Sequence, residues 1–182
     1  VITQVSVPTR VGKSVLAALG TLSLSAAVLI APAHAADTGL FGTQDATYDG
    51  VYRQSLAVAG LAAADARIPA AAVDWLLDQQ CADGSFEAFR PNTSTPCSPS
   101  DPKNFSGPDT NSTSMAAIAL YLAGRTAPAR DAIVWLNDVQ NDDWGFPFHS
   151  GGASDANSTA LSVMALQTVQ PQDRSGRVPN AQ

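Results

Sequence analysis

Hydrophobic positions divide the chain after residue 50 into two alternating kinds of segment. Three segments are rich in small apolar residues and apolar on nearly every side: 55–66, 114–124 and 160–169. Two others, 70–80 and 129–140, carry aliphatic residues on one stripe and aspartates opposite. The spacing of apolar positions by three and four predicts five helices. We expect the first kind to be buried on most sides and the second kind to cover a core with one face.

These helices repeat along the chain. Trp75 recurs as Trp135 and Gln80 recurs as Gln140 at one and the same interval. Gly84 is matched by Gly145, one position later than that interval, which implies one insertion. The first two small-residue segments begin at nearly the same spacing. A repeat that contains two helices is typical of stacked helical hairpins. The sequence therefore predicts an all-α domain of two and a half hairpins.

A polar head of one pattern, Asp-x-Asn-Ser-Thr, precedes the second and third small-residue segments. Aspartate at a helix start accepts hydrogen bonds from free backbone N–H groups, so we predict that Asp109 and Asp155 cap helices. Serine can do the same at a slightly later boundary. The alternative is that the heads face a ligand through Asp109, Asn111, Ser112, Asp155, Asn157 and Ser158.

The ends of the two amphipathic segments resemble the QW motif, in which an aromatic residue is followed by Gln, Gly and a second aromatic. The first copy has Trp75, Gln80, Gly84 and Phe86, and the second has Trp135, Gln140, Gly145 and Phe146, with no residue between Gly and Phe. The chain thus resembles the prenyltransferase and squalene-oxidase repeat of the terpene cyclase and protein prenyltransferase superfamily, in particular its secreted actinobacterial members.

That resemblance implies an α/α toroid, in which inner helices ring a cavity and outer helices surround them. The motif residues would then pack one repeat on the next, or alternatively line a site for an apolar ligand. The chain has about half the hairpins of a closed toroid, and the loop 169–182 stands where the next outer helix should begin. We expect either a truncated chain lacking C-terminal repeats or a homo-oligomer, because an open arc exposes apolar helix sides.

The catalytic residues of the family, unlike its repeat motif, are not found in this chain. Cyclases of the superfamily carry Asp-x-Asp-Asp-Thr-Ala-Met at an inner-helix head, and the middle Asp supplies the proton. Here Asn111 and Asn157 hold that position, and an amide is no general acid. Prenyltransferases of the superfamily hold zinc with Asp, Cys and His, and these ligands do not map onto one cluster in this chain, where His149 is the single histidine after the signal region.

We therefore expect no catalytic residues, no metal and no cofactor. The sequence favours a non-catalytic binding or scaffold module whose partner is an apolar or terpenoid small molecule. The alternative is part of an enzyme, a cyclase or transferase, acting on terpenoid or prenyl substrates. Paired carboxylates at Asp142 and Asp143 lie in a motif turn, where a solvated turn is the simpler interpretation.

Residues 1–35 predict a secretory signal peptide. Arg10 and Lys13 precede an uncharged apolar run, 15–30, and Ala33-His34-Ala35 offers small residues for cleavage near Ala35. The apolar run is shorter than the ~20 residues of a membrane span. The repeat domain, 36–182, would be extracellular and free of the membrane after cleavage. Of the 10 Lys and Arg, two lie in the signal, and all 16 Asp and Glu follow it, an acidic balance that disfavours nucleic acid.

The chain has two cysteines, Cys81 and Cys97. In an exported protein a disulfide is the expected state. The bridge would pin a loop rich in Pro, Ser and Asn, which we predict to be irregular. A thiol metal ligand is the alternative, and the scarcity of histidine disfavours it.

Overall fold

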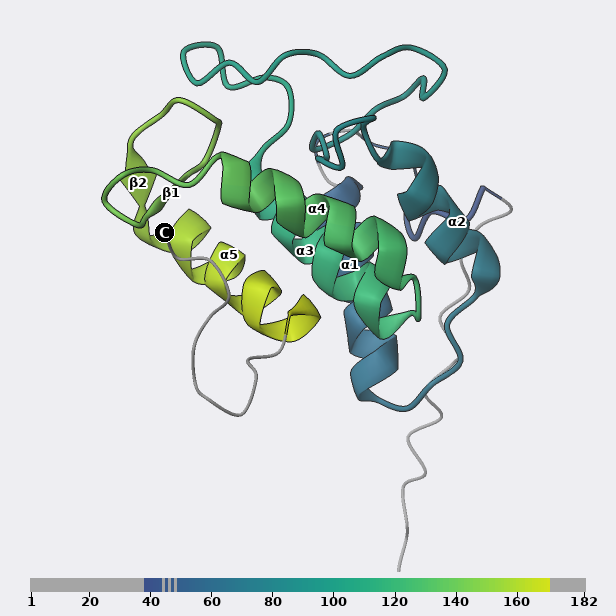
Figure 1. Ribbon diagram of the computed structural model, residues 1–182. Helices are drawn as coiled ribbons and strands as arrows, with labels where there is room; N and C mark the ends of the chain where they lie inside the picture. Colours follow the sequence, from purple (N-terminus) through teal and green to yellow (C-terminus); the bar gives the residue numbers. More distant parts are fainter. Residues whose placement is uncertain (1–37, 44, 46, 48, 171–182) are drawn as a thin grey trace, which may run out of the picture. The chain divides into compact units, whose positions relative to one another are not determined.

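The computed structural model describes residues 38–43, 45, 47 and 49–170, all within the compact unit Ala33–Gln182 (Figure 1). They form the helices α1 (Val51–Ala63), α2 (Ala70–Gln79), α3 (Thr110–Leu122), α4 (Thr126–Asp138) and α5 (Ala156–Val169). Two short strands, β1 (Phe146–Pro147) and β2 (Ser154–Asp155), pair antiparallel. The described part is thus mostly helical, as the hydrophobic spacing predicts. The predicted signal peptide and the loop 171–182 lie outside the described residues.

The small-residue helices α1, α3 and α5 each begin about one turn before the predicted start. The polar head is therefore the first turn of the helix, and the predicted boundary is wrong by that turn. Asp109 and Asp155 hold the N-cap positions of α3 and α5, and Gly50 holds that of α1. Serine, threonine and asparagine disfavour helix interiors but suit the first turn, where they bond free backbone groups.

Helix α3 is the central helix of the described part. It packs against α1, α5 and α4 (Figure 1), and every residue from Ser112 to Leu120 is buried. Its alanines at 116, 117 and 119 are fully buried, so neighbouring backbones approach closely. An all-round apolar surface is what a helix enclosed on several sides requires. The same expectation is wrong for α1 and α5, which pack against α3 on one side and leave residues such as Leu56 and Met164 about half exposed.

Helices α2 and α4 bury one face each, as their amphipathic pattern predicts. In α2 the buried face includes Val73 and Leu76, whereas Asp74 and Asp78 are exposed. In α4 the buried residues are Ala129, Ala132, Ile133, Trp135 and Leu136. Together with Phe86 and Phe146 from the turns that follow each helix, they complete one hydrophobic core.

The segment between α2 and α3 is a long loop, irregular as predicted. Cys81 and Cys97 form the predicted disulfide, with Cα atoms 5.7 Å apart. Beside it, the buried Arg90 guanidinium donates to four backbone carbonyl oxygens, those of Gln79, Gln80, Thr93 and Thr95. The loop is therefore tied to the end of α2 by one covalent bond and one buried cation.

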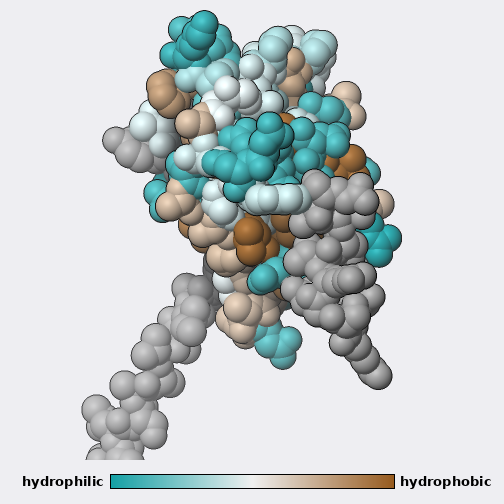
Figure 2. Space-filling model, turned by 60° about the vertical axis from the view of Figure 1, so that its left-hand side comes forward, coloured by the Kyte–Doolittle hydropathy of each residue, from teal (hydrophilic) through white to brown (hydrophobic). Residues whose placement is uncertain are grey.

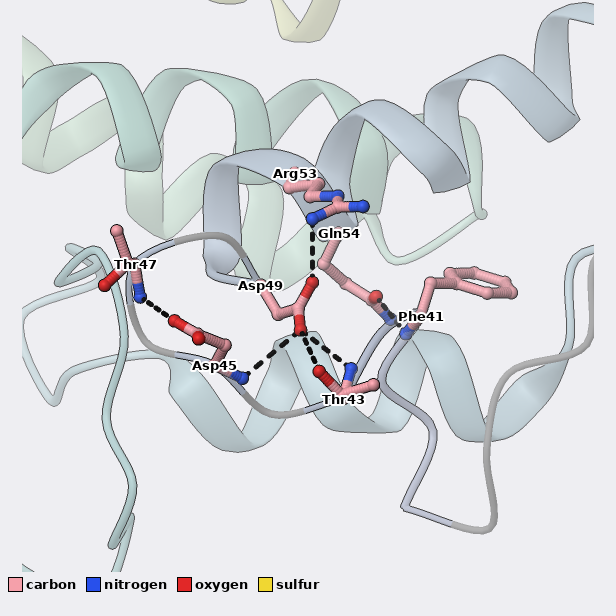
Figure 3. A network of polar contacts seen from close by, with 7 residues as sticks. All are labelled: Phe41, Thr43, Asp45, Thr47, Asp49, Arg53 and Gln54. Carbon is pink, nitrogen blue, oxygen red and sulfur yellow. Dashed lines mark hydrogen bonds and ion pairs between the residues drawn. The ribbon is translucent and has the colours of Figure 1, made fainter.

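A second tie fixes the segment before α1 (Figure 3). The Asp49 carboxylate accepts from the backbone nitrogens of Thr43 (2.7 Å) and Asp45 (3.2 Å) and from the Arg53 guanidinium at 2.9 Å. The backbone bonds from Thr43 and Asp45 are the main cause that lowers the pKa of Asp49. The ionised carboxylate at the helix start also suits the positive end of the helix dipole.

Candidate functional site

The two repeated heads are helix caps, as predicted. One Asp109 oxygen accepts from the Ser112 backbone nitrogen at 2.7 Å. One Asp155 oxygen accepts from the backbone nitrogens of Asn157 and Ser158, both at 2.9 Å. The carboxylates therefore satisfy backbone donors that every helix start leaves free.

The last residue of each head is a threonine that hydrogen-bonds to the motif turn at Phe86 or Phe146. This role was not predicted from the sequence. The Thr113 hydroxyl accepts from the Phe86 backbone nitrogen at 3.0 Å and donates to the Asp109 carbonyl at 2.7 Å. The Thr159 hydroxyl accepts from the Phe146 backbone nitrogen at 2.9 Å. The threonine that both heads share was the signal in the sequence that could have predicted these bonds, because a hydroxyl can accept one hydrogen bond and donate another.

Hydrogen bonds correct the alignment of the two QW turns. Gln80 donates to the Gly84 carbonyl, and Gln140 donates to the Trp144 carbonyl, both at 3.0 Å. Trp144 is therefore the counterpart of Gly84, at the same interval that separates the two glutamines, and nothing is inserted between them. The match of Gly145 with Gly84 was wrong, since both Gly84 (φ 89°) and Trp144 (φ 65°) adopt the left-handed conformation that glycine adopts without strain.

A third, partial copy of the turn precedes α1. The Phe41 backbone nitrogen donates to the Gln54 side chain at 2.9 Å (Figure 3), as Phe86 and Phe146 donate to their threonines. Gly39 has a φ of 82°, and a Cβ there would meet the Ala71 carbonyl oxygen at 2.0 Å. A Cβ on Gly84 would likewise meet the Asp131 carbonyl oxygen at 2.5 Å. Each glycine thus lets its turn lie directly against the backbone of an amphipathic helix, at Ala71 of α2 and at Asp131 of α4.

The motif glutamine and aromatics lie where the turns meet the helices. Gln80 also donates to the Pro128 carbonyl at 2.9 Å, which joins the end of α2 to the start of α4. Phe86 and Phe146 are fully buried, and Trp135 is nearly so. Trp75 is half-buried and stacks 6.3 Å from Phe89. Asp143, in the second turn, accepts from Gly145 and Ser154, so it serves the turn.

The structure does not bring the six head residues together. Asp109 and Ser112 are buried, and Asn111 is half-buried with a buried side-chain oxygen that has no hydrogen-bond partner among the described residues. Asp155 and Asn157 are exposed. Ser158 is buried, and its hydroxyl donates to Asp155 at 2.6 Å. The second head is therefore a surface cap, whereas the first lies beneath other chain segments.

What lies over the first head is His149, which forms a β-bridge with Asp109. Its Nδ1 lies 3.0 Å from the Pro108 carbonyl oxygen. Because that oxygen can only accept, Nδ1 carries the hydrogen, and when the ring carries this one hydrogen Nε2 is a lone-pair acceptor. His149 is 4% exposed, and its Nε2 has no partner within the described chain. A buried acceptor without a partner is uncommon.

A hollow of about 240 Å³ lies beside this histidine. The rings of Phe89, Phe105 and Phe148 line it, together with Glu87, Asp109 and His149. Phe148 meets the imidazole edge-on at 4.6 Å, and the mostly exposed Phe105 does so at 6.1 Å. The arrangement combines an aromatic wall with the polar side chains of Glu87, Asp109 and His149. We call this the His149 hollow.

A larger hollow of about 770 Å³ lies under the disulfide loop, lined by Arg90, Trp135 and loop residues. The Arg90 nitrogens Nη1 and Nη2 already donate to backbone carbonyls. In the described part of the chain, the buried polar side-chain atoms without partners belong to Ser55, Asn111 and His149, and none of these residues lines the larger hollow. The His149 hollow is therefore the better candidate site.

The two capping carboxylates differ in electrostatics. Burial raises the pKa of Asp109, and hydrogen bonds from Ser112 offset this only in part. The Ser158 hydroxyl is the main cause that lowers the pKa of Asp155. Ionised Asp155 therefore stabilises the fold at neutral pH, and this is lost as the pH falls through its folded pKa. Ionised Asp109 opposes folding above its raised pKa, and the opposition disappears in acid.

Asp109→Asn is accordingly expected to leave the free energy of unfolding at neutral pH unchanged or higher. Asparagine keeps the acceptor oxygen of the cap and removes the buried charge. Urea unfolding of variant and wild type from neutral to acidic pH checks this, and any advantage of the variant should shrink toward acid. A variant that is clearly less stable at neutral pH would contradict the prediction.

Within the described residues, no group of three or more His, Cys, Asp or Glu side chains could hold a metal ion. The same part of the chain contains no helix long and apolar enough to cross a membrane. Fold and site define a mostly helical protein in which the buried helix α3 is surrounded by helices that bury one side each, with a disulfide-closed loop. No protein-family model matches the chain, and no curated protein or solved structure matches it significantly.

Proposed function

We propose that this chain is a secreted, non-catalytic binding module built from helical hairpins of the terpene cyclase and prenyltransferase type, about half of an α/α toroid. Support comes from the enclosed helix α3 with one-sided helices packed around it, and from two turns that recur at the interval of the repeat with the same hydrogen bonds. The disulfide is the bond expected of an exported protein. The ligand is an apolar small molecule held at an inner-helix head.

The observation that carries this proposal is the unpartnered Nε2 of His149 beside three phenylalanine rings. A buried acceptor is stabilised by any ligand that brings it a donor. The ligand body then lies against the rings. At about 240 Å³, the hollow is smaller than the about 300–1,000 Å³ of typical drug-sized sites. It suits a short prenyl or terpenoid alcohol, whose hydroxyl donates to His149.

Entry of such a ligand requires a side chain to move, since Nε2 is closed to solvent. Phe105 is 74% exposed and only touches the imidazole from its edge. Turning this ring outward would open the hollow on the side of Phe105 and lose little buried apolar surface. Phe105 therefore serves as the movable part of the wall, and Phe148, which is half-buried, as its fixed part.

A second candidate, part of a cyclase or transferase, has one observation in its favour. Asp109 is a buried carboxyl with a raised pKa, the property that an acid catalyst needs. One of its oxygens is occupied by the Ser112 backbone nitrogen, and Asn111 stands at the family's acid position. We therefore favour binding. Loss of turnover of a prenyl substrate in Asp109→Asn, with stability unchanged, would support the enzyme instead.

The binding proposal is tested by calorimetric titration with geraniol and with geranyl methyl ether, which has the same apolar body and no donor. We expect geraniol to bind about tenfold more tightly, the contribution of one neutral hydrogen bond to a buried acceptor. His149→Phe should abolish this preference. Equal affinities for alcohol and ether, or no binding of either, would overturn the proposal whether or not the variant folds.

A further inference from the structure

The small-residue helices α1, α3 and α5 each have two sides that matter for their packing on one another, a forward flank and a rear flank. The forward flank comprises Val51, Ser55 and Val58 on α1, Thr110, Ser114 and Ala117 on α3, and Ala156, Ala160 and Val163 on α5. The rear flank comprises Arg53, Ala57 and Gly60 on α1, Ser112, Ala116 and Ala119 on α3, and Ser158, Ser162 and Ala165 on α5. Members of one flank recur every three or four positions and so share a helix side.

One hydrogen bond fixes which flank meets which. The Ser114 hydroxyl lies 3.2 Å from the Ser162 hydroxyl in a buried contact between α3 and α5. The forward flank of α3 therefore packs on the rear flank of α5. Two positions along a helix turn it by about 200°, so Ala116 faces the opposite side of α3, toward α1.

The pattern of burial agrees with forward flanks packing on rear flanks, both between α1 and α3 and between α3 and α5. All members of the forward flanks of α1 and α3 are fully buried. The rear flanks of α3 and α5 are buried as well, with at most 3% exposure at Ser112. Two flanks remain. On α5, Ala156 and Ala160 are exposed and Val163 is 39% exposed, whereas its α3 counterpart Ala117 is fully buried.

The other flank with open positions is the rear of α1, and these positions are Ala57 and Gly60. Gly60 is exposed, and nothing lies within 4 Å of a Cβ placed there. Its counterpart on α3, Ala119, is fully buried. Ala57 is half-buried, and Arg53 pairs with Asp49 at 2.9 Å. The side of the molecule that carries α5 is shown in Figure 2, where hydrophobic surface is exposed below a hydrophilic upper part.

We infer that this protein associates head to tail with a second copy of itself, the open forward flank of α5 packing on the open rear flank of α1 in the partner. This contact between two copies would repeat the packing of forward flank on rear flank that α1 makes with α3, and that α3 makes with α5, within one chain. Alanine and glycine on both open flanks allow the same close approach of backbones. Each copy then offers one flank and receives the other, so two or more copies can close into a ring.

The test uses protein purified from the medium of a secreting host and analysed by sedimentation over a wide range of concentration. We expect the wild type to sediment as a dimer or larger closed assembly. Val163→Glu and Gly60→Glu place a carboxylate on the two flanks separately, and each should weaken association about a hundredfold, because burying an unpaired charge is strongly unfavourable. Both positions have open surroundings, so the helices should remain folded.

Val134→Glu is the matched control, since Val134 is 56% exposed on α4, outside both flanks, and this variant should associate as the wild type does. Mixing the Val163 and Gly60 variants should restore a one-to-one complex, because each retains the flank that the other has lost. A monomeric wild type, association that survives in either variant, or failure of the two monomeric variants to combine would each overturn the inference.

Discussion

Phe86→Ala is expected to lower the free energy of unfolding by about 3–5 kcal/mol, the range for large-to-small substitutions of buried aromatic residues. The ring is fully buried in the core. Its backbone is held on both sides, because the nitrogen donates to Thr113 at 3.0 Å and the carbonyl oxygen accepts from the Asp109 nitrogen at 3.0 Å. The turn therefore cannot collapse into the cavity. Urea unfolding followed by circular dichroism measures the loss.

Phe105→Ala is the control for this variant. It removes the same ring from a residue that is 74% exposed, and a surface change of this kind usually shifts stability by no more than about 0.5 kcal/mol. A similar loss in both variants would contradict the assignment of Phe86 to the core. It would also put in question the turn as the unit that joins one repeat to the next.

Replacing both cysteines by serine is expected to lower the free energy of unfolding by up to about 3 kcal/mol. The bridge spans a sequence separation of 16, and closing a loop of this length restricts the unfolded chain by roughly that amount. Arg90 holds the same loop through the carbonyl oxygens of Thr93 and Thr95. The folded variant should therefore keep the loop in place, and the loss arises mainly in the unfolded state.

Chemical denaturation of wild type and double-serine variant, each with and without reductant, measures this contribution. Reductant should bring the wild type down to the stability of the variant and leave the variant unchanged. A reductant effect on the variant would show that something other than the bridge responds. Equal stability of the oxidised wild type and the variant would show that the bridge contributes nothing.

The five helices follow from sequence because their apolar spacing is local and strong. Their starts follow less directly, since the apolar spacing alone begins each segment about one turn late, whereas the caps predicted at Asp109 and Asp155 give the starts of α3 and α5. Asp109 and Asp155 each begin a helical turn, and the serine and threonine behind them lie inside it. A residue that disfavours helix interiors is tolerated there because the first turn leaves backbone donors free.

The repeat is visible in sequence, but its register is partly misjudged there. Matching glycine with glycine places Gly145 against Gly84, whereas the hydrogen bonds place Trp144 there. Backbone conformation, and not residue type, defines the equivalent positions. The partial copy at Gly39 and Phe41 was missed for a related reason, because Gln54 replaces the threonine that clamps the other two turns.

The candidate site depends still more on tertiary structure. The sequence offers six head residues as ligand-facing, and four of them serve the two helix starts as capping carboxylates or as the serines that bond to them. His149 enters the sequence analysis only as a metal ligand. Its interest lies in a ring nitrogen that is buried without a partner among the described residues, which depends on how two distant segments, at Pro108 and His149, meet.

By itself, then, the sequence determined the kinds of helix, their alternation, the period of the repeat and the disulfide, because each rests on spacing or on residue type. Only the tertiary structure decided which carboxylate is buried, which turn positions correspond and which flanks of α1 and α5 remain open. Those properties depend on what packs against a residue, and here the packing joins segments far apart in the chain.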